Sequence, residues 1–176
     1  MKRCLCGIIA VVLLFLVGCN EKILDEDKKS YAESFWTENK ESLMSATKEA
    51  FSLLENTEKD IMILTLTGGN VVCEGEQSAE YNAPSLKKIM MLSERPIWIR
   101  EKSIEFGLPG AGFGPNTSYC GLIYIPSDDI NDFPYSFPEL DLTYAENAVY
   151  GSSRSTDNRV YIERIENCVF YYEMSF

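Results

Sequence analysis

Apolar residues recur at helical spacing in the segment from Thr37 to Glu55, and the spacing defines one side of a helix. The positions lie at i, i+3, i+4, i+7, i+8 and i+11, which makes a single apolar stripe. They are Leu43, Ala46, Thr47, Ala50, Phe51 and Leu54. The pattern therefore predicts an amphipathic helix from Thr37 to Glu55 that packs on the core through this stripe.

From Ile61 onward the apolar positions alternate, as is typical of strands. The alternating segments are residues 61–67, 70–73, 96–106, 119–125, 159–165 and 168–174. Gly68-Gly69 between the first two predicts a two-residue hairpin turn. Residues 86–92 fit either a helix that begins at Pro84 or a further strand, and both readings stay open. The segments 107–116 and 126–138 are rich in glycine or proline and predict loops.

Together these elements predict the α+β class, with the N-terminal amphipathic helix packed on a mainly antiparallel sheet of about six strands. The short, hairpin-like spacing of the strands excludes a parallel doubly wound fold, which needs a crossover between successive strands. In the last strand, alternation assigns Cys168, Phe170, Tyr172 and Met174 to the core and leaves Tyr171 for contact with a partner.

The start of the chain has a different pattern. Lys2 and Arg3 precede an apolar run over residues 8–17, and Leu-Val-Gly-Cys occupies residues 16–19. This arrangement resembles a bacterial lipoprotein signal with its lipobox, although an ordinary secretory signal or a short core helix is the alternative. The resemblance implies a diacylglycerol thioether on Cys19, cleavage before it and acylation of the new amino terminus.

The lipobox divides the chain into a signal peptide (1–18), a tether that carries Cys19 (19–30) and a single globular domain (31–176). The chain is therefore expected to be anchored by lipid in a bacterial cell envelope, with the outer membrane as its expected location. Two or three buried acyl chains suffice for a stable anchor without any protein insertion.

A second resemblance covers 22 residues. The segment from Glu33 to Leu54 (ESFWTENKESLMSATKEAFSLL) resembles the first helix of SusD-like outer-membrane nutrient-binding lipoproteins. In those proteins an aromatic pair likewise precedes an alanine-rich helix soon after the lipidated cysteine. They are several times longer and dominated by helical repeats, whereas the rest of this chain is β-rich. Glycan binding is therefore not transferred on this resemblance.

Composition excludes several classes of chemistry. Histidine is absent, so neither a Ser-His-Asp or Cys-His nucleophile system nor a His-ligated metal can form. The net charge is −11, and it becomes −13 when the signal leaves with Lys2 and Arg3. Such a charge disfavours nucleic acid as a partner. No cofactor and no catalytic residue is predicted.

Three cysteines lie beyond the signal and Cys19, namely Cys73, Cys120 and Cys168. They permit one disulfide with one thiol left over, or three free thiols in apolar strands. An acidic loop holds Asp128, Asp129 and Asp132, whose oxygens suit Ca²⁺. Phe133 and Pro134 occupy places where a calcium loop needs a ligand and a glycine, so a solvated loop without metal is predicted.

Two functions remain open. One is a non-catalytic lipoprotein, of inhibitor or immunity type for example, that binds a basic envelope or effector protein through Tyr171 and the Asp128, Asp129 and Asp132 loop. Eight of the ten tyrosines follow residue 118, and tyrosine suits recognition surfaces. The other is a surface lipoprotein that captures a glycan or small ligand. In that case Trp98, which alternates with apolar neighbours, would face outward as a stacking platform.

Overall fold

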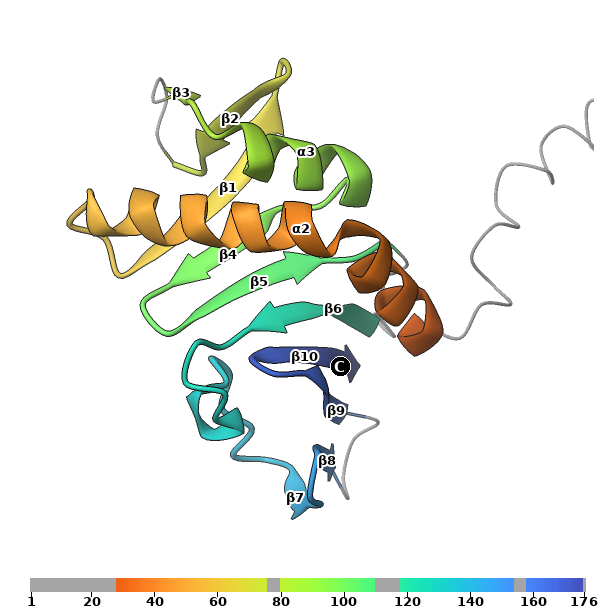
Figure 1. Ribbon diagram of the computed structural model, residues 1–176. Coiled ribbons are helices and arrows are strands. Elements are labelled where there is room, and N and C mark those ends of the chain that lie inside the picture. Colours follow the sequence, from red (N-terminus) through yellow and green to blue (C-terminus); the bar gives the residue numbers. More distant parts are fainter. Residues whose placement is uncertain (1–27, 76–79, 110–117, 154–157, 176) are drawn as a thin grey trace, which may run out of the picture.

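A computed structural model describes residues 28–75, 80–109, 118–153 and 158–175. These residues form two α-helices and one antiparallel sheet of ten strands (Figure 1). The α+β class is confirmed, whereas the prediction of about six strands is wrong. The signal peptide, Cys19 and most of the glycine-rich loop lie outside the described residues.

The helices are α2 (Lys28–Glu55) and α3 (Pro84–Ser93), and a short 3-10 helix covers Ile130–Asp132. The strands are β1 (Ile61–Thr67), β2 (Asn70–Cys73), β3 (Glu80–Tyr81), β4 (Ile97–Arg100), β5 (Ser103–Gly107), β6 (Ser118–Tyr124), β7 (Asp141–Tyr144), β8 (Ala148–Ser152), β9 (Arg159–Glu166) and β10 (Val169–Ser175). Their order in the sheet is β3-β2-β1-β4-β5-β6-β10-β9-β8-β7.

Helix α2 begins nine residues before the predicted start. The apolar stripe continues upstream through Ala32, Phe35 and Trp36, all of which are buried, so this side of the first turns also packs on the core. Trp36 Nε1 donates a hydrogen bond to Glu166 Oε2 (2.6 Å), which ties the helix to the end of β9. Residues 28–30 of the predicted tether are therefore helical.

Helix α3 settles the segment that the sequence left open. Pro84 occupies its first turn, where the missing N–H of proline costs nothing. The Glu49 carboxylate of α2 accepts hydrogen bonds from the backbone N–H groups of Ser85 (2.9 Å) and Leu86 (3.1 Å). It thereby satisfies two donors that the helix itself leaves unpaired.

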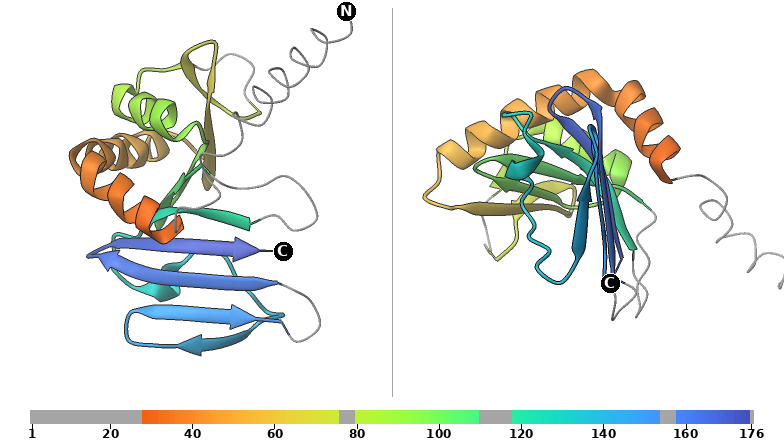
Figure 2. Two further views of the ribbon diagram at one scale, coloured as in Figure 1. Left: turned by 90° about the vertical axis from the view of Figure 1, so that its right-hand side faces the viewer. Right: turned by 90° about the horizontal axis from the view of Figure 1, so that it is seen from below.

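Both helices lie on the same side of the sheet (Figure 1). The larger core fills the space between them and the strands, and includes Leu43, Ile89, Ile99 and Leu122. A second core lies on the opposite side of the last strands, where the segment after β6 packs on Phe170 and Tyr172. The start of α2 reaches β9, whereas the strands β8 and β7 extend past the helices and have none above them (Figure 2).

Two hairpins match their predictions. Gly68 and Gly69 join β1 to β2 with φ of 59° and 83°, a conformation that glycine adopts without strain. Strands β9 and β10 form the terminal hairpin. The three unpredicted strands are β3, β7 and β8. The first is only two residues long, and the other two carry exposed polar side chains on the uncovered side of the sheet.

Candidate functional site

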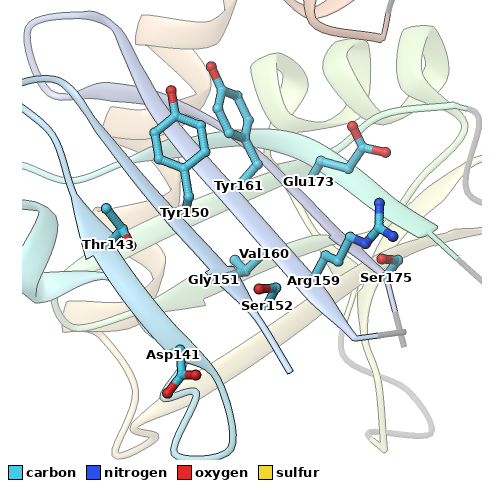
Figure 3. A pocket seen from close by; sticks show the side chains of 10 residues that line it. All are labelled: Asp141, Thr143, Tyr150, Gly151, Ser152, Arg159, Val160, Tyr161, Glu173 and Ser175. Atoms are coloured by element: carbon cyan, nitrogen blue, oxygen red, sulfur yellow. The ribbon is translucent and has the colours of Figure 1, made fainter. Parts of the chain in front are cut away.

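The helix side of β7, β8 and β9 forms a shallow hollow of about 440 Å³ (Figure 3). We call it the open face and define it by the side chains that line it: Asp141, Thr143, Tyr150, Ser152, Arg159, Tyr161, Glu173 and Ser175. Strand alternation brings them together, because the paired positions in neighbouring strands share one side of the sheet. The hollow is continuous with the sheet and needs no loop to form it.

Tyr150 and Tyr161 form the aromatic part of the open face. They are cross-strand partners whose ring centroids lie 5.1 Å apart at a tilt of 56° (Figure 3). Tyr161 also packs on the buried ring of Tyr171, with a centroid distance of 6.0 Å. Tyr150 is 46% exposed. The row therefore presents an accessible ring that is supported from behind by a fixed one.

The charged part of the open face is connected to the start of α2. Glu173 accepts a hydrogen bond from Lys28 Nζ (2.5 Å), and Glu163 beside it forms an ion pair with Lys29 (2.7 Å). Arg159 lies opposite Ser175 in the strand pairing. Both signs of charge therefore border the tyrosines, an arrangement that suits polar or peptide ligands better than apolar ones.

A pocket of about 330 Å³ lies on the other side of the same strands. We call it the aromatic pocket. Its walls include Phe133, Phe137, Leu142, Tyr144 and Val149. Phe133 stands 6.2 Å from Phe137 and 6.1 Å from Tyr172 between ring centroids. The pocket opens beside β7, so both sides of this strand border a concave surface.

A buried carboxylate fixes the segment that walls the aromatic pocket. Glu105 is 3% exposed. Its Oε1 accepts a hydrogen bond from Tyr172 Oη (2.5 Å), and its Oε2 accepts bonds from Tyr135 Oη (2.5 Å) and Arg100 Nη1 (3.2 Å). We call these four residues the Glu105 network. Because both carboxylate oxygens accept hydrogen bonds within the protein, the network stabilises the fold and does not resemble the site of an acid–base catalyst.

The Glu105 network also changes the ionisation of its tyrosines. Burial, reinforced by the charge of Glu105, raises the pKa of Tyr172 and of Tyr135. Tyr172 reaches Glu105 by lying across Gly121 of β6. A Cβ at this glycine would come within 2.9 Å of the tyrosine Oη and 2.6 Å of Phe106 O. Gly121 is therefore required for the close approach of the ring.

Tyr171 does not lie where the sequence analysis placed it. It is 1% exposed and belongs to the core beneath the helices, so the prediction that it contacts a partner is wrong. The alternation of β10 was assigned correctly, but both of its sides are covered: one by α2 and the other by the segment after β6. A strand in the middle of a sheet that is covered on both sides has no outward face.

The predicted acidic loop is largely engaged within the protein. Asp128 forms an ion pair with Arg164 and accepts a hydrogen bond from Cys168 N (2.6 Å). Asp132 pairs with Lys102 (2.9 Å), which together with Ser127 holds the pKa of Asp132 low. Asp129 accepts a hydrogen bond from Asn131 N (2.9 Å) and is the one that stays exposed. Of the three, Asp128 and Asp132 thus have structural roles.

Trp98 lies on the side of β4 that faces away from the helices, in agreement with its alternation, and is half-buried. Its Cζ3 would stand 3.5 Å from a Cβ at Gly107, so the indole leans over β5. This side is opposite to the open face, and the structure does not bring Trp98 together with Tyr150 and Tyr161. A single stacking site that includes Trp98 and the open face is therefore excluded.

The three cysteines in the described part of the chain are free thiols. Cys73 and Cys120 are buried, and burial raises the pKa of the Cys120 thiol. Among the described residues, no three acidic or cysteine side chains are grouped so as to hold a metal ion. No helix in the described ranges has the length and apolar character to cross a membrane.

No protein-family model, curated protein or solved structure matches this chain significantly. The site must therefore be interpreted from its own geometry. Sequence reasoning missed Tyr150, Arg159 and Asp141. The clustering of tyrosines after residue 118 was the available signal, but only the strand pairing shows which of them share a side of the sheet.

Proposed function

We propose that this chain is a non-catalytic envelope lipoprotein, anchored through lipid on Cys19, that binds another protein. The observation that carries the proposal is the open face: a rigid, uncovered part of the sheet that exposes a tyrosine supported by two further tyrosine rings. Tyrosine combines a large apolar area with a polar tip and is enriched in protein interfaces. Because the rings are already packed, little conformational entropy is lost when a partner binds.

The distribution of charge favours a basic partner. No lysine or arginine occurs between Lys102 and Arg154, whereas this stretch holds seven acids: Glu105, Asp128, Asp129, Asp132, Glu139, Asp141 and Glu146. At least three of them form ion pairs within the protein. The last three lie at or next to β7 and give this end of the sheet a negative potential, which speeds association with a positively charged surface. An inhibitor or immunity-type role fits this arrangement.

The test uses the chain from Asn20 onward, which contains every described residue of the fold, as bait for native envelope extract. Tyr150→Ala removes the accessible ring of the open face. Tyr119→Ala is the matched control, since Tyr119 is exposed to a similar extent (48% against 46%) but lies on the opposite side of the sheet. The expected result is that the wild-type chain captures one basic protein in stoichiometric amount and that moderate salt releases it. The Tyr119→Ala variant should still capture this protein, and the Tyr150→Ala variant should not.

Recovery of the same protein by both variants would remove the open face as the binding site. Recovery of no specific protein would remove the proposed function itself. A second candidate, glycan or small-ligand capture, rests on the tyrosine rings standing beside Arg159 and Glu173 in the 440 Å³ hollow. Retention of the wild-type chain on a polysaccharide, with loss in Tyr150→Ala, would favour that candidate.

A further inference from the structure

Strand β7 forms one edge of the sheet and pairs with β8 alone. Ala145 N donates a hydrogen bond to Ala148 O (2.8 Å), which makes these two residues a hydrogen-bonded pair. In an antiparallel ladder such pairs alternate with non-bonded ones. Thr143 and Asp141 therefore direct their backbone groups to β8, whereas Leu142 and Tyr144 direct theirs away from the sheet.

The outward N–H and C=O groups of Leu142 and Tyr144 form a short template for a further strand. The opposite edge of the sheet differs, because β3 has only two residues. Strand β7 also borders concave surfaces on both sides. Its Asp141 and Thr143 side chains line the open face, and its Leu142 and Tyr144 side chains line the aromatic pocket.

This geometry specifies the sequence of an added strand. Residues opposite Leu142 and Tyr144 would place their side chains over the aromatic pocket, where apolar groups fit. Residues between them would place theirs beside Asp141 on the open face, where basic groups fit. The acids Glu139, Asp141 and Glu146 oppose pairing of β7 with the same strand of a second copy, since like charges would meet there.

We infer that β7 accepts an extended segment of a basic protein as an eleventh strand, with apolar and basic side chains in alternation. The inference rests on the proposed function and names the kind of partner segment. Main-chain hydrogen bonds to Leu142 and Tyr144 supply affinity. The aromatic pocket and the acids around β7 supply selectivity for the two sets of side chains.

The test is peptide binding to the chain from Asn20 onward at physiological salt, measured by calorimetry and by amide exchange in NMR. The peptide is an acetylated octapeptide amide in which lysine and valine alternate. In a second version the backbone amide nitrogens of the valines are methylated, and in a third version those of the lysines. The side chains, the charge and the order of residues are the same in all three. In an antiparallel added strand, with the valines opposite Leu142 and Tyr144, the valine N–H groups would face β7 and the lysine N–H groups would face away from it.

The expected result is binding of the unmethylated and lysine-methylated peptides, loss of binding with the valine-methylated one, and slower exchange of the Leu142 and Tyr144 amides. Equal binding of all three peptides would reduce the effect to charge attraction and overturn the inference. Absence of binding by all three, or slowed exchange at other strands alone, would overturn it as well.

A matched pair of variants tests the protein side. Tyr144→Pro removes one outward N–H at an exposed edge position, where proline is tolerated, and Tyr144→Ala removes the side chain but keeps the N–H. Tyr144→Pro is expected to weaken peptide binding by roughly tenfold, in line with one lost hydrogen bond, and Tyr144→Ala by much less. Equal weakening by both would overturn the role of the backbone.

The two proposals fail in different ways. An envelope partner that tolerates Tyr144→Pro but not Tyr150→Ala would leave the proposed function intact and remove the β7 edge from it. If the peptide binds at β7 but no envelope partner is found, the inference that β7 accepts an added strand stands and the proposed function is overturned. If the chain forms a dimer that does not depend on salt and that Tyr144→Pro abolishes, a second copy of the chain and not a basic segment occupies β7. This result would overturn the inference.

Discussion

Replacing Glu105 by glutamine is the sharpest test of what holds the pocket-forming segment to the sheet. The substitution keeps the shape of the side chain and removes its charge. One carboxylate oxygen becomes an amide nitrogen, which cannot accept the hydrogen bond that Tyr172 or Tyr135 donates in the native protein. Arg100 also loses the buried carboxylate that faces its guanidinium at 3.2 Å.

The magnitude follows from these losses. A hydrogen bond to a charged group contributes about 1.5–3 kcal/mol, and removal of one partner from a buried ion pair costs about 3–5 kcal/mol. The side chain of Arg100 is 17% exposed, so water compensates part of its loss, and the two effects share the same atoms and do not add. We expect Glu105→Gln to lower the free energy of unfolding by about 3 kcal/mol.

The assay is urea unfolding followed by circular dichroism and tryptophan fluorescence. A shift of the midpoint at constant slope would show lost stability in an unchanged fold. Glu101→Gln, an exposed position in the turn between β4 and β5, is the control and should change stability by less than about 0.5 kcal/mol. A loss below about 1 kcal/mol in Glu105→Gln would refute the reasoning, because the network would then contribute no more than an exposed pair.

Three further predictions concern the same region and the thiols. The pKa of Tyr172 is raised above its unfolded value of 10.0. The stability that the neutral hydroxyl contributes is therefore complete below pH 10 and is lost as the pH rises from there through the pKa of the folded protein. The free energy of unfolding, obtained from urea titrations at increasing alkaline pH, should therefore fall less steeply in Tyr172→Phe than in the wild-type chain. The two slopes should differ by up to about 1.4 kcal/mol per pH unit. Gly121→Ala should destabilise the fold by about 3 kcal/mol or more in the same unfolding assay, because its Cβ would meet Phe106 O at 2.6 Å. A thiol reagent should label Cys168 in the native chain from Asn20 onward, and Cys73 and Cys120 only after unfolding, as mass spectrometry of the labelled peptides would show.

The sequence allowed the elements with strong periodicity to be predicted. The stripe of α2, the hairpin at Gly68-Gly69 and the terminal hairpin each follow from local spacing and turn chemistry. Strands β7 and β8 could not be predicted in the same way, since they have only four and five residues and offer too few apolar positions for a periodicity to stand out. The local pattern of residues 86–92 also does not reveal that Glu49, which lies far upstream, caps the first turn of α3.

The candidate site was harder to predict than the fold, for a physical reason. Alternation states which residues of one strand share a side, but it does not state what covers that side. Tyr171 and Tyr161 both belong to the terminal hairpin, and the sequence analysis assigned an outward position to Tyr171 alone. Helix α2 covers the first of them, whereas the second lies beyond the helix on the open face. The two tyrosines lie on neighbouring strands, and only the position of α2 in the folded protein decides which of them is covered.

The open face follows from the dimensions of the elements. Neighbouring strands lie about 4.8 Å apart, so a ten-stranded sheet is roughly 45 Å wide, whereas a helix with its side chains covers about 10 Å. Helices α2 and α3 pack side by side over the strands from β2 to β10, and α2 reaches β9 through its ion pairs and Trp36, whereas β8 and β7 have no helix above them. These strands stay folded because their apolar residues face the second core, on the opposite side. The chain thus stabilises the last strands from one side and leaves the other accessible, which is the arrangement that a binding surface on a rigid scaffold requires.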